Sequence, residues 1–165
     1  MNLDFSKETI INLTRDYLKD NLKIAYFDDI QKQPGEEHYY LLAALSMQMK
    51  GKKIIEIGTH TGRSALTLNY GNSKLNNNNT IFTYDIANIL LPNIFDNTNI
   101  QFKLDNLLDI SIRENNKEHI LSADLIFIDI DPHEGILEYD MYIWLKNNNY
   151  KGLILFDDIY LDATV

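Results

Sequence analysis

Five short apolar runs alternate with longer stretches of helical character after residue 52, and polar or acidic residues follow the end of each run. The runs span residues 53–57, 80–85, 100–104, 124–129 and 152–156. Their length and composition predict strands, and the stretches between them predict connecting segments that include helices. The first, fourth and fifth runs are almost wholly apolar, which is typical of parallel strands covered on both faces. The sequence therefore predicts an α/β protein.

Right-handed crossovers between parallel strands give a doubly wound, Rossmann-like sheet. We expect the strand order 3-2-1-4-5 with helices on both faces, the helices spanning residues 6–20, 36–50, 63–70 and 134–147. Ligands bind such sheets at the carboxyl ends of the strands, near the switch point between strands one and four. The polar residues gather at those ends, at positions 56–62, 85, 105, 129–133 and 157–158.

Length and composition limit the function further. The 165 residues suit one domain, with N-terminal helices over 1–50 and a Rossmann-like core over 51–165. Fifteen basic against 24 acidic residues give a net charge of −9, which disfavours a nucleic-acid substrate. Cysteine is absent, so thiol chemistry is excluded. No membrane span or signal peptide is visible, and the simplest expectation is a cytoplasmic protein without a membrane partner. Asparagine runs at 76–79 and 147–149 suggest filler in permissive loops.

The first strand runs into Glu-x-Gly-x-x-x-Gly and then a helix, at residues 56–62. Gly58 permits a tight turn with close ligand approach, and Gly62 lets the helix start against the strand. His60 stands where the dinucleotide-binding fingerprint has a second glycine, which weakens that interpretation. Asp85 ends the second strand, where a carboxylate can accept hydrogen bonds from both ribose hydroxyls of an adenosine. Alone, Asp85 is equally compatible with an ordinary strand–helix turn.

These residues carry a family resemblance. Residues 56–64 resemble the first motif of class I S-adenosylmethionine (SAM)-dependent methyltransferases, and residues 84–86 resemble the second. Residues 127–131, 133–135 and 156–159 are similar to the metal-dependent small-molecule O-methyltransferase branch, which includes catechol and macrocin O-methyltransferase relatives. The resemblance covers residue 36 to the C-terminus. It implies SAM as cofactor, bound by Glu56, Gly58, Thr59, Thr61, Gly62, Ser64, Asp85 and Asp105.

The sequence departs from the family pattern in two ways. Relatives read Asp-x-Asp-His directly, whereas Pro132 precedes His133 here. The family fold has seven strands, and this chain stops just after the fifth, so we expect a truncated domain without strands six and seven. A strand-five edge left open in this way favours a homodimer or the remainder of a larger polypeptide as partner.

Three aspartates form the candidate metal site. Asp129 ends strand four, and Asp157 and Asp158 end strand five, so neighbouring strands bring their carboxylates together. Converging carboxylates repel unless a cation neutralises them, and oxygen ligands favour Mg²⁺. The plainer alternative is that some of them point to solvent or cap the following helix. By resemblance, Asp129, Asp157 and Asp158 match the metal ligands of the family.

The implied reaction transfers a methyl group to a hydroxyl of a small molecule or sugar. A divalent ion at Asp129 would acidify the acceptor hydroxyl, and His133 could take its proton. Two other functions compete with this interpretation. Asp129-Ile130-Asp131 could hold the metal–diphosphate of a glycosyltransferase, although the glycine loop and Asp85 are then unexplained. The chain could also be a non-catalytic methyltransferase-like domain of a larger protein.

Overall fold

The computed structural model describes residues 2–16, 36–130 and 135–157. Its helices are α1 (Lys7–Thr14), α4 (Glu36–Gln48), α5 (Arg63–Leu68), α6 (Tyr70–Leu75), α7 (Ile110–Asn115), α8 (Lys117–Leu121) and α9 (Ile136–Asn147). Its strands are β1 (Lys53–Ile57), β2 (Thr80–Asp85), β3 (Ile100–Leu104), β4 (Leu125–Ile128) and β5 (Leu153–Phe156).

The chain separates into two compact units that interleave along the sequence. The sheet unit comprises the described residues of Lys52–His60, Ile81–Ile89 and Gln101–Val165. The helical unit comprises those of Met1–Gly51, Thr61–Thr80 and Leu90–Ile100. The prediction of one domain over residues 1–165 stays a prediction.

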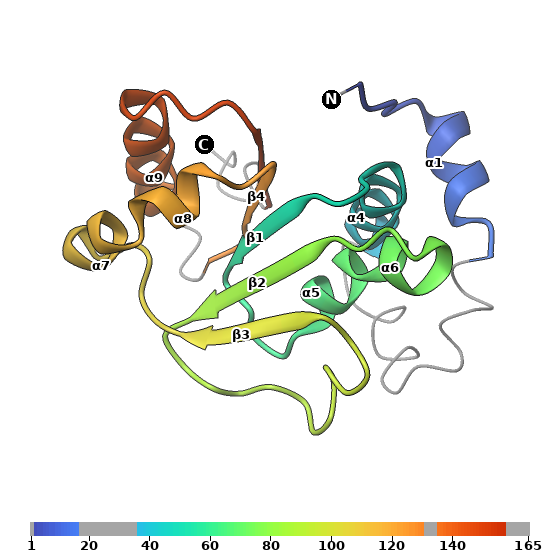
Figure 1. Cartoon of the computed structure of the whole chain (residues 1–165), viewed down its shortest axis with the longest axis horizontal. Helices are drawn as coiled ribbons and strands as arrows, with labels where there is room; N and C mark the ends of the chain where they lie inside the picture. The colour runs from blue at the N-terminus through green and yellow to red at the C-terminus, as the bar shows by residue number, and fades with distance from the viewer. Residues whose placement is uncertain (1, 17–35, 131–134, 158–165) are drawn as a thin grey trace, which may run out of the picture. The chain divides into compact units, whose positions relative to one another are not determined.

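The strands form one sheet in the predicted order β3-β2-β1-β4-β5. Figure 1 shows β1, β2 and β3 side by side with their arrows in the same direction. β1 pairs in parallel with β4, with Ile57 opposite Ile128, and β4 pairs in parallel with β5, with Ile128 opposite Phe156. The observed strands match the predicted runs to within one residue at each end. The parallel, Rossmann-like sheet is therefore confirmed.

One face of the sheet carries the largest core of this unit. Alternate residues of β1 and β4, such as Ile55 and Ile126, pack with Ile120 of α8 and with Met141 and Leu145 of α9. Residues between them on the strands, including Ile54 and Leu125, are buried as well. Both faces of the central strands are thus apolar and buried, as the sequence predicts for a parallel sheet.

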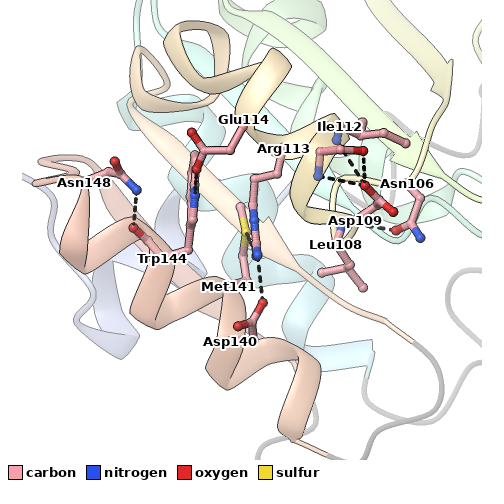
Figure 2. A network of polar contacts seen from close by, with 11 residues as sticks. Asn106, Leu108, Asp109, Ile112, Arg113, Glu114, Asp140, Met141, Trp144 and Asn148 are labelled. Atoms are coloured by element: carbon pink, nitrogen blue, oxygen red, sulfur yellow. Dashed lines mark hydrogen bonds and ion pairs between the residues drawn. The ribbon is translucent and has the colours of Figure 1, made fainter.

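A buried arginine links α7 to α9 (Figure 2). The Arg113 side chain is only 1% exposed, and its Nη2 lies 2.8 Å from Oδ2 of Asp140. The guanidinium also lies over the Trp144 ring, 5.3 Å from its centroid, and Trp144 Nε1 donates to Glu114 at 2.5 Å. Because the long stem of an arginine packs like an apolar side chain, Arg113 belongs to the core despite its charge. Neither α7 nor α8 was among the helices predicted from the sequence.

A histidine and a lysine join α8 to β1. Lys53 Nζ lies 2.9 Å from Nδ1 of His119 and donates to Oγ of Ser122 at 2.7 Å, so Nδ1 is an acceptor. The His119 ring stands edge-on to Phe82 of β2, with ring centroids 4.5 Å apart. Burial, and then the charges of Lys53 and Lys103, lower the pKa of His119 below its ordinary value. The folded protein therefore favours the neutral imidazole.

This arrangement predicts a loss of stability as the pH falls. Above the ordinary histidine pKa, His119 is neutral in both the folded and the unfolded state. Below it, the unfolded chain binds the proton first, so the free energy of unfolding decreases. His119→Asn is expected to flatten this slope between about pH 7 and 5, as measured by urea midpoints. Ser122→Ala, which removes one acceptor of Lys53 but no titrating group, should keep the wild-type slope; equal slopes for wild type and His119→Asn would contradict the prediction.

In the helical unit, buried asparagines cap the carboxyl end of α4. Asn77 Nδ2 donates to the carbonyls of Ser46 and Met47 at 3.0 and 2.9 Å, and Asn79 Nδ2 donates to that of Met49 at 2.9 Å. The last carbonyls of a helix lack partners within the helix, so these amides satisfy them. Their neighbours Asn76 and Asn78 have positive φ, which asparagine tolerates well. The interpretation of residues 76–79 as filler is therefore wrong.

The helices of this unit differ from prediction mainly at their ends. α1 begins where expected, with Ser6 Oγ accepting from Thr9 N, and residues 17–20 of the predicted helix lie outside the described residues. α4 ends at Gln48, and Gly51 has the positive φ expected of a helix stop. A further helix, α6, was not predicted. Its Gly71 lies so close to α4 that a Cβ there would be 2.1 Å from the Ser46 carbonyl oxygen.

Candidate functional site

The loop from β1 to α5 turns through three residues with positive φ. These are Gly58 at 99°, His60 at 48° and Gly62 at 93°. Glycine reaches this region without strain, whereas histidine does so at a cost. His60 is held there by a hydrogen bond from its backbone N to Oδ2 of Asp85, 2.7 Å long. The loop therefore uses its histidine in a conformation that usually requires glycine.

The two glycines of the loop are required by different neighbours. A Cβ on Gly58 would lie 1.5 Å from the carbonyl oxygen of Asp129, so the end of β1 touches the end of β4. A Cβ on Gly62, the residue before α5, would lie 2.9 Å from Cζ of Phe95 in the helical unit. The close contact that requires glycine at position 58 is thus with the backbone of Asp129. The sequence did not predict this contact.

Asp85 is fixed at the end of β2 by backbone donors. Its Oδ1 accepts from Ala87 N at 3.0 Å, in addition to the bond from His60 to Oδ2. The backbone N of Asp105 donates to the Asp85 carbonyl at 2.9 Å, so the ends of β2 and β3 lie together. A carboxylate oriented by two N–H groups keeps further lone pairs for a ligand.

A cavity of about 410 Å³ opens at these strand ends and lies within the sheet unit. Its wall is formed by Ile57, Gly58, His60, Tyr84, Asp85, Ile86, Ile89, Asp105, Asn106, Leu107, Leu108, Asp129 and Ile130. Burial, and then the charge of Asp105, raise the pKa of Tyr84, so its hydroxyl stays neutral. The volume is that of a small-molecule site with mixed apolar and polar walls. The structure thus brings Gly58, Asp85, Asp105 and Asp129 of the predicted site around one cavity.

Other predicted cofactor residues do not line this cavity. Glu56 is fully buried and accepts a hydrogen bond from Thr83 of β2, whose Oγ1 also lies 2.5 Å from that of Thr59. In the helical unit, Ser64 is buried in α5, and the Thr61 carbonyl accepts from Leu91 N at 3.2 Å. Glu56 and Thr59 therefore join β1 to β2, and their cofactor role stays a prediction.

The predicted metal site is described only in part. Asp129 N donates to the Ile57 carbonyl at 2.9 Å, and Asp157 N donates to that of Ile128 at 3.0 Å, so both aspartates continue the strand ladder. His133 and Asp158 lie outside the described residues. Within the described residues, no three acidic or metal-binding side chains form a cluster. The type of donor that Asp129 and Asp157 provide fits a hard divalent ion.

Two isoleucines at the cavity, Ile86 and Ile89, were not predicted as site residues from the sequence. Ile86 is 73% exposed and Ile89 is 51% exposed, yet both line the cavity. Large apolar side chains that stay exposed beside a cavity indicate a binding surface. The sequence feature that could have predicted this surface is the isoleucine directly after Asp85, the last residue of β2.

Comparison with solved structures places this cavity in a known fold. The Podospora anserina methyltransferase PaMTH1, bound to S-adenosylhomocysteine (SAH), matches with a TM-score of 0.53 and 18% identity, over 99% of this chain and 75% of that chain. The O-methyltransferase from Bacillus cereus in complex with SAH matches with a TM-score of 0.51 and 20% identity, over 85% of this chain and 62% of that chain. The chain has their fold. The methyltransferase fold agrees with the sheet order, with the glycine loop after β1 and with the acidic end of β2.

Two further comparisons found no match. No family model and no curated protein matches the sequence.

No helix of the described residues has the length and apolar character needed to cross a membrane.

Proposed function

We propose that the chain is the core of a SAM-dependent methyltransferase that acts on a hydroxyl of a small molecule or sugar. One observation carries the proposal: Gly58 and His60 of the glycine loop line one cavity together with Asp85 and Asp105, at the carboxyl ends of the strands. In open α/β sheets this is where ligands bind. The fold is shared with two methyltransferases whose structures contain SAH, which supports the same cofactor here.

The cavity offers matching partners for an adenosyl group. The remaining lone pairs of Asp85 can accept the two ribose hydroxyls, which are hydrogen-bond donors. The exposed isoleucines Ile86 and Ile89, together with Leu107, provide an apolar surface for a flat purine. Asp105 adds an acceptor for an exocyclic amine.

The transfer itself requires alignment of the acceptor oxygen with the donor methyl group. In the proposed enzyme, Asp129 and Asp157 would hold a divalent cation, with Asp158 as a third ligand inferred from the sequence. When bound, such an ion acidifies a coordinated hydroxyl and makes it a better nucleophile. His133 remains the candidate for the base that accepts the proton.

Calorimetry with SAH tests the cofactor assignment. Asp85→Asn replaces one anionic acceptor oxygen by an amide donor, and we expect SAH affinity to fall roughly tenfold to a hundredfold. Glu118→Gln is the matched control, because it removes one exposed carboxylate of α8 that lies outside the cavity wall. Failure of the wild-type protein to bind SAH would refute the proposed function. Equal SAH affinity in Asp85→Asn and wild type would refute the role of Asp85.

The glycosyltransferase alternative has less support. A metal–diphosphate ligand carries negative charge, which usually requires lysine or arginine nearby. Among the described residues that line the cavity there is no lysine and no arginine, while Asp85, Asp105 and Asp129 are all acidic. Repulsion between these carboxylates and a diphosphate favours the methyltransferase proposal.

A further inference from the structure

The loop between β3 and α7 forms one wall of the cavity. Asn106, Leu107 and Leu108 all line it. The loop is closed by its own polar groups, because Leu108 N donates to Asn106 Oδ1 and Asp109 N donates to the Asn106 carbonyl, both at 3.0 Å. The backbone N of Arg113 donates in turn to the Asp109 carbonyl at 2.9 Å. The loop and α7 are therefore one continuous segment, and the position of α7 sets the position of this wall.

α7 does not hold that position by itself. It has six residues, and an isolated helix of this length is not stable in water. All six residues are described, and Arg113 is the one whose side chain is buried, whereas Ile110 is 65% exposed. Contacts from Arg113 and its neighbours to other elements must therefore place the helix.

Two side chains of α7 reach across to α9 (Figure 2). Arg113 Nη2 lies 2.8 Å from Asp140 Oδ2, and Nη1 lies 3.5 Å from Met141 Sδ. Glu114 Oε1 accepts from Trp144 Nε1 at 2.5 Å, and the guanidinium lies over the same indole ring, 5.3 Å from its centroid. We call these contacts together the α7–α9 clamp.

The clamp is not the arrangement that would stabilise the core most. Arg113 Nε is buried and has no hydrogen-bond partner within the described residues, and such an atom lowers stability. Well-packed apolar side chains in place of a buried ion pair are often neutral or stabilising. The directional bonds of Arg113 instead define one arrangement of α7 against α9, because purely apolar contacts would let the short helix slide or rotate.

We propose that Arg113 is a positioning residue for the cavity: through the clamp it holds residues 106–108 in the arrangement that binds the ligand. The inference rests on the proposed function and adds to it a residue outside the cavity wall. Leu107 connects the two places, since it lines the cavity and packs in the same core cluster as Met141 of α9. Without the clamp, α7 and its loop adopt further arrangements, so the ligand must select a less populated one and binds more weakly.

The coupling acts in both directions. A ligand that contacts Leu107 and Leu108 favours the loop position in which α7 is clamped, because coupling between two sites is reciprocal. Trp144 is the one tryptophan of the chain, so its fluorescence reports on the clamp without a contribution from other tryptophans. We therefore expect SAH to protect Trp144 from quenching by acrylamide.

Calorimetric titration with SAH, combined with this quenching measurement, tests the inference. Arg113→Met keeps an apolar stem and removes the guanidinium, whereas Asp140→Asn removes the charge on α9. We expect each variant to weaken SAH binding roughly fivefold or more. The double variant should bind no more weakly than the weaker single variant, because both changes remove the same contact. SAH should also protect Trp144 less in each variant than in wild type.

Two control variants separate positioning from general stability. Glu118→Gln removes an exposed carboxylate, as Asp140→Asn does, but from α8. Ile54→Val shortens a fully buried side chain of β1 that belongs neither to the clamp nor to the cavity wall, so it lowers stability alone. Both controls should bind SAH as wild type does, and urea midpoints show how much stability each variant has lost.

Three results would contradict the inference. Wild-type SAH affinity in Asp140→Asn, or in a folded Arg113→Met, would leave Arg113 a packing residue only. A loss of affinity in Ile54→Val as large as in the clamp variants would show that affinity follows stability. If wild-type protein does not bind SAH, the proposed function fails and the inference fails with it. Asp140→Asn keeps the test decisive if Arg113→Met does not fold, because the Asp140 side chain is 57% exposed.

Discussion

Gly58→Ala is expected to remove most of the folding stability, by at least about 4 kcal/mol. The added Cβ would lie 1.5 Å from the Asp129 carbonyl oxygen and 2.6 Å from its carbonyl carbon. These are backbone atoms at the end of a central strand, so they cannot move aside as a flexible side chain would. The positive φ of 99° adds strain for any residue with a Cβ.

Gly135→Ala separates the two causes. Gly135 has a positive φ of 72°, but a Cβ there would meet no atom of the described residues within 4 Å. Its cost should be the backbone strain alone, about 1 kcal/mol. Urea unfolding of both variants measures the difference, and equal destabilisation would show that the contact with Asp129 is unimportant. Because Gly58 supports the fold, a Gly58 variant that fails to bind a cofactor says little about ligand contact.

Chelation of divalent cations is expected to abolish methyl transfer, with a loss on the order of a hundredfold or more. The reason is the pair of carboxylates, Asp129 and Asp157, at the ends of β4 and β5. In the proposed mechanism, a cation held there would stabilise the negative charge that develops on the acceptor oxygen. The measurement is transfer of a labelled methyl group from SAM to a panel of catechol and sugar hydroxyls, in Mg²⁺ and in EDTA.

SAH affinity is the internal control for this experiment. Asp85, the proposed partner of the ribose, is not one of the proposed metal ligands, so chelation should change the dissociation constant of SAH by less than about twofold. Asp129→Asn and Asp157→Asn should reproduce the effect of EDTA, and each should lose the Mn²⁺ site that we expect paramagnetic resonance to detect in wild type. Undiminished transfer in EDTA would leave a metal-free mechanism.

The centre of the sheet was predictable because β1 and β4 are buried. Together with β5 they read as short apolar runs, and runs of this length favour buried strands. The rule that ligands bind at the strand ends of an open α/β sheet singled out Asp85 and Asp105, and both line the cavity.

The helices α6, α7 and α8 were not predicted, because their sequences do not indicate how they pack. α7 and α8 are six and five residues long, too short for a clear helical period. Their buried side chains include Arg113 of α7, a residue type that a hydropathy pattern counts as exposed. α6 contains Gly71, a residue that lowers the expectation of a helix, yet the close approach of α4 requires it.

The site was predictable in its residue types and less so in their contacts. The motif 56–62 placed its glycines correctly, but the contact of Gly58 with Asp129 and the bond of Glu56 to Thr83 depend on neighbouring strands. The left-handed conformation of His60 depends on Asp85, 25 positions further along the chain. The spacing of residues in the sequence does not predict any of these contacts.

The asparagine caps of α4 also set a limit on the chemical lifetime of the protein. Deamidation is the slow reaction that converts an asparagine amide into a carboxylate, and asparagine is among the residues that heat damages first. At Asn77 or Asn79 it would replace an N–H donor by a negative oxygen facing the carbonyl oxygens of Ser46, Met47 or Met49. An attraction would become a repulsion in a buried place. Deamidation at either position would therefore destabilise the end of α4.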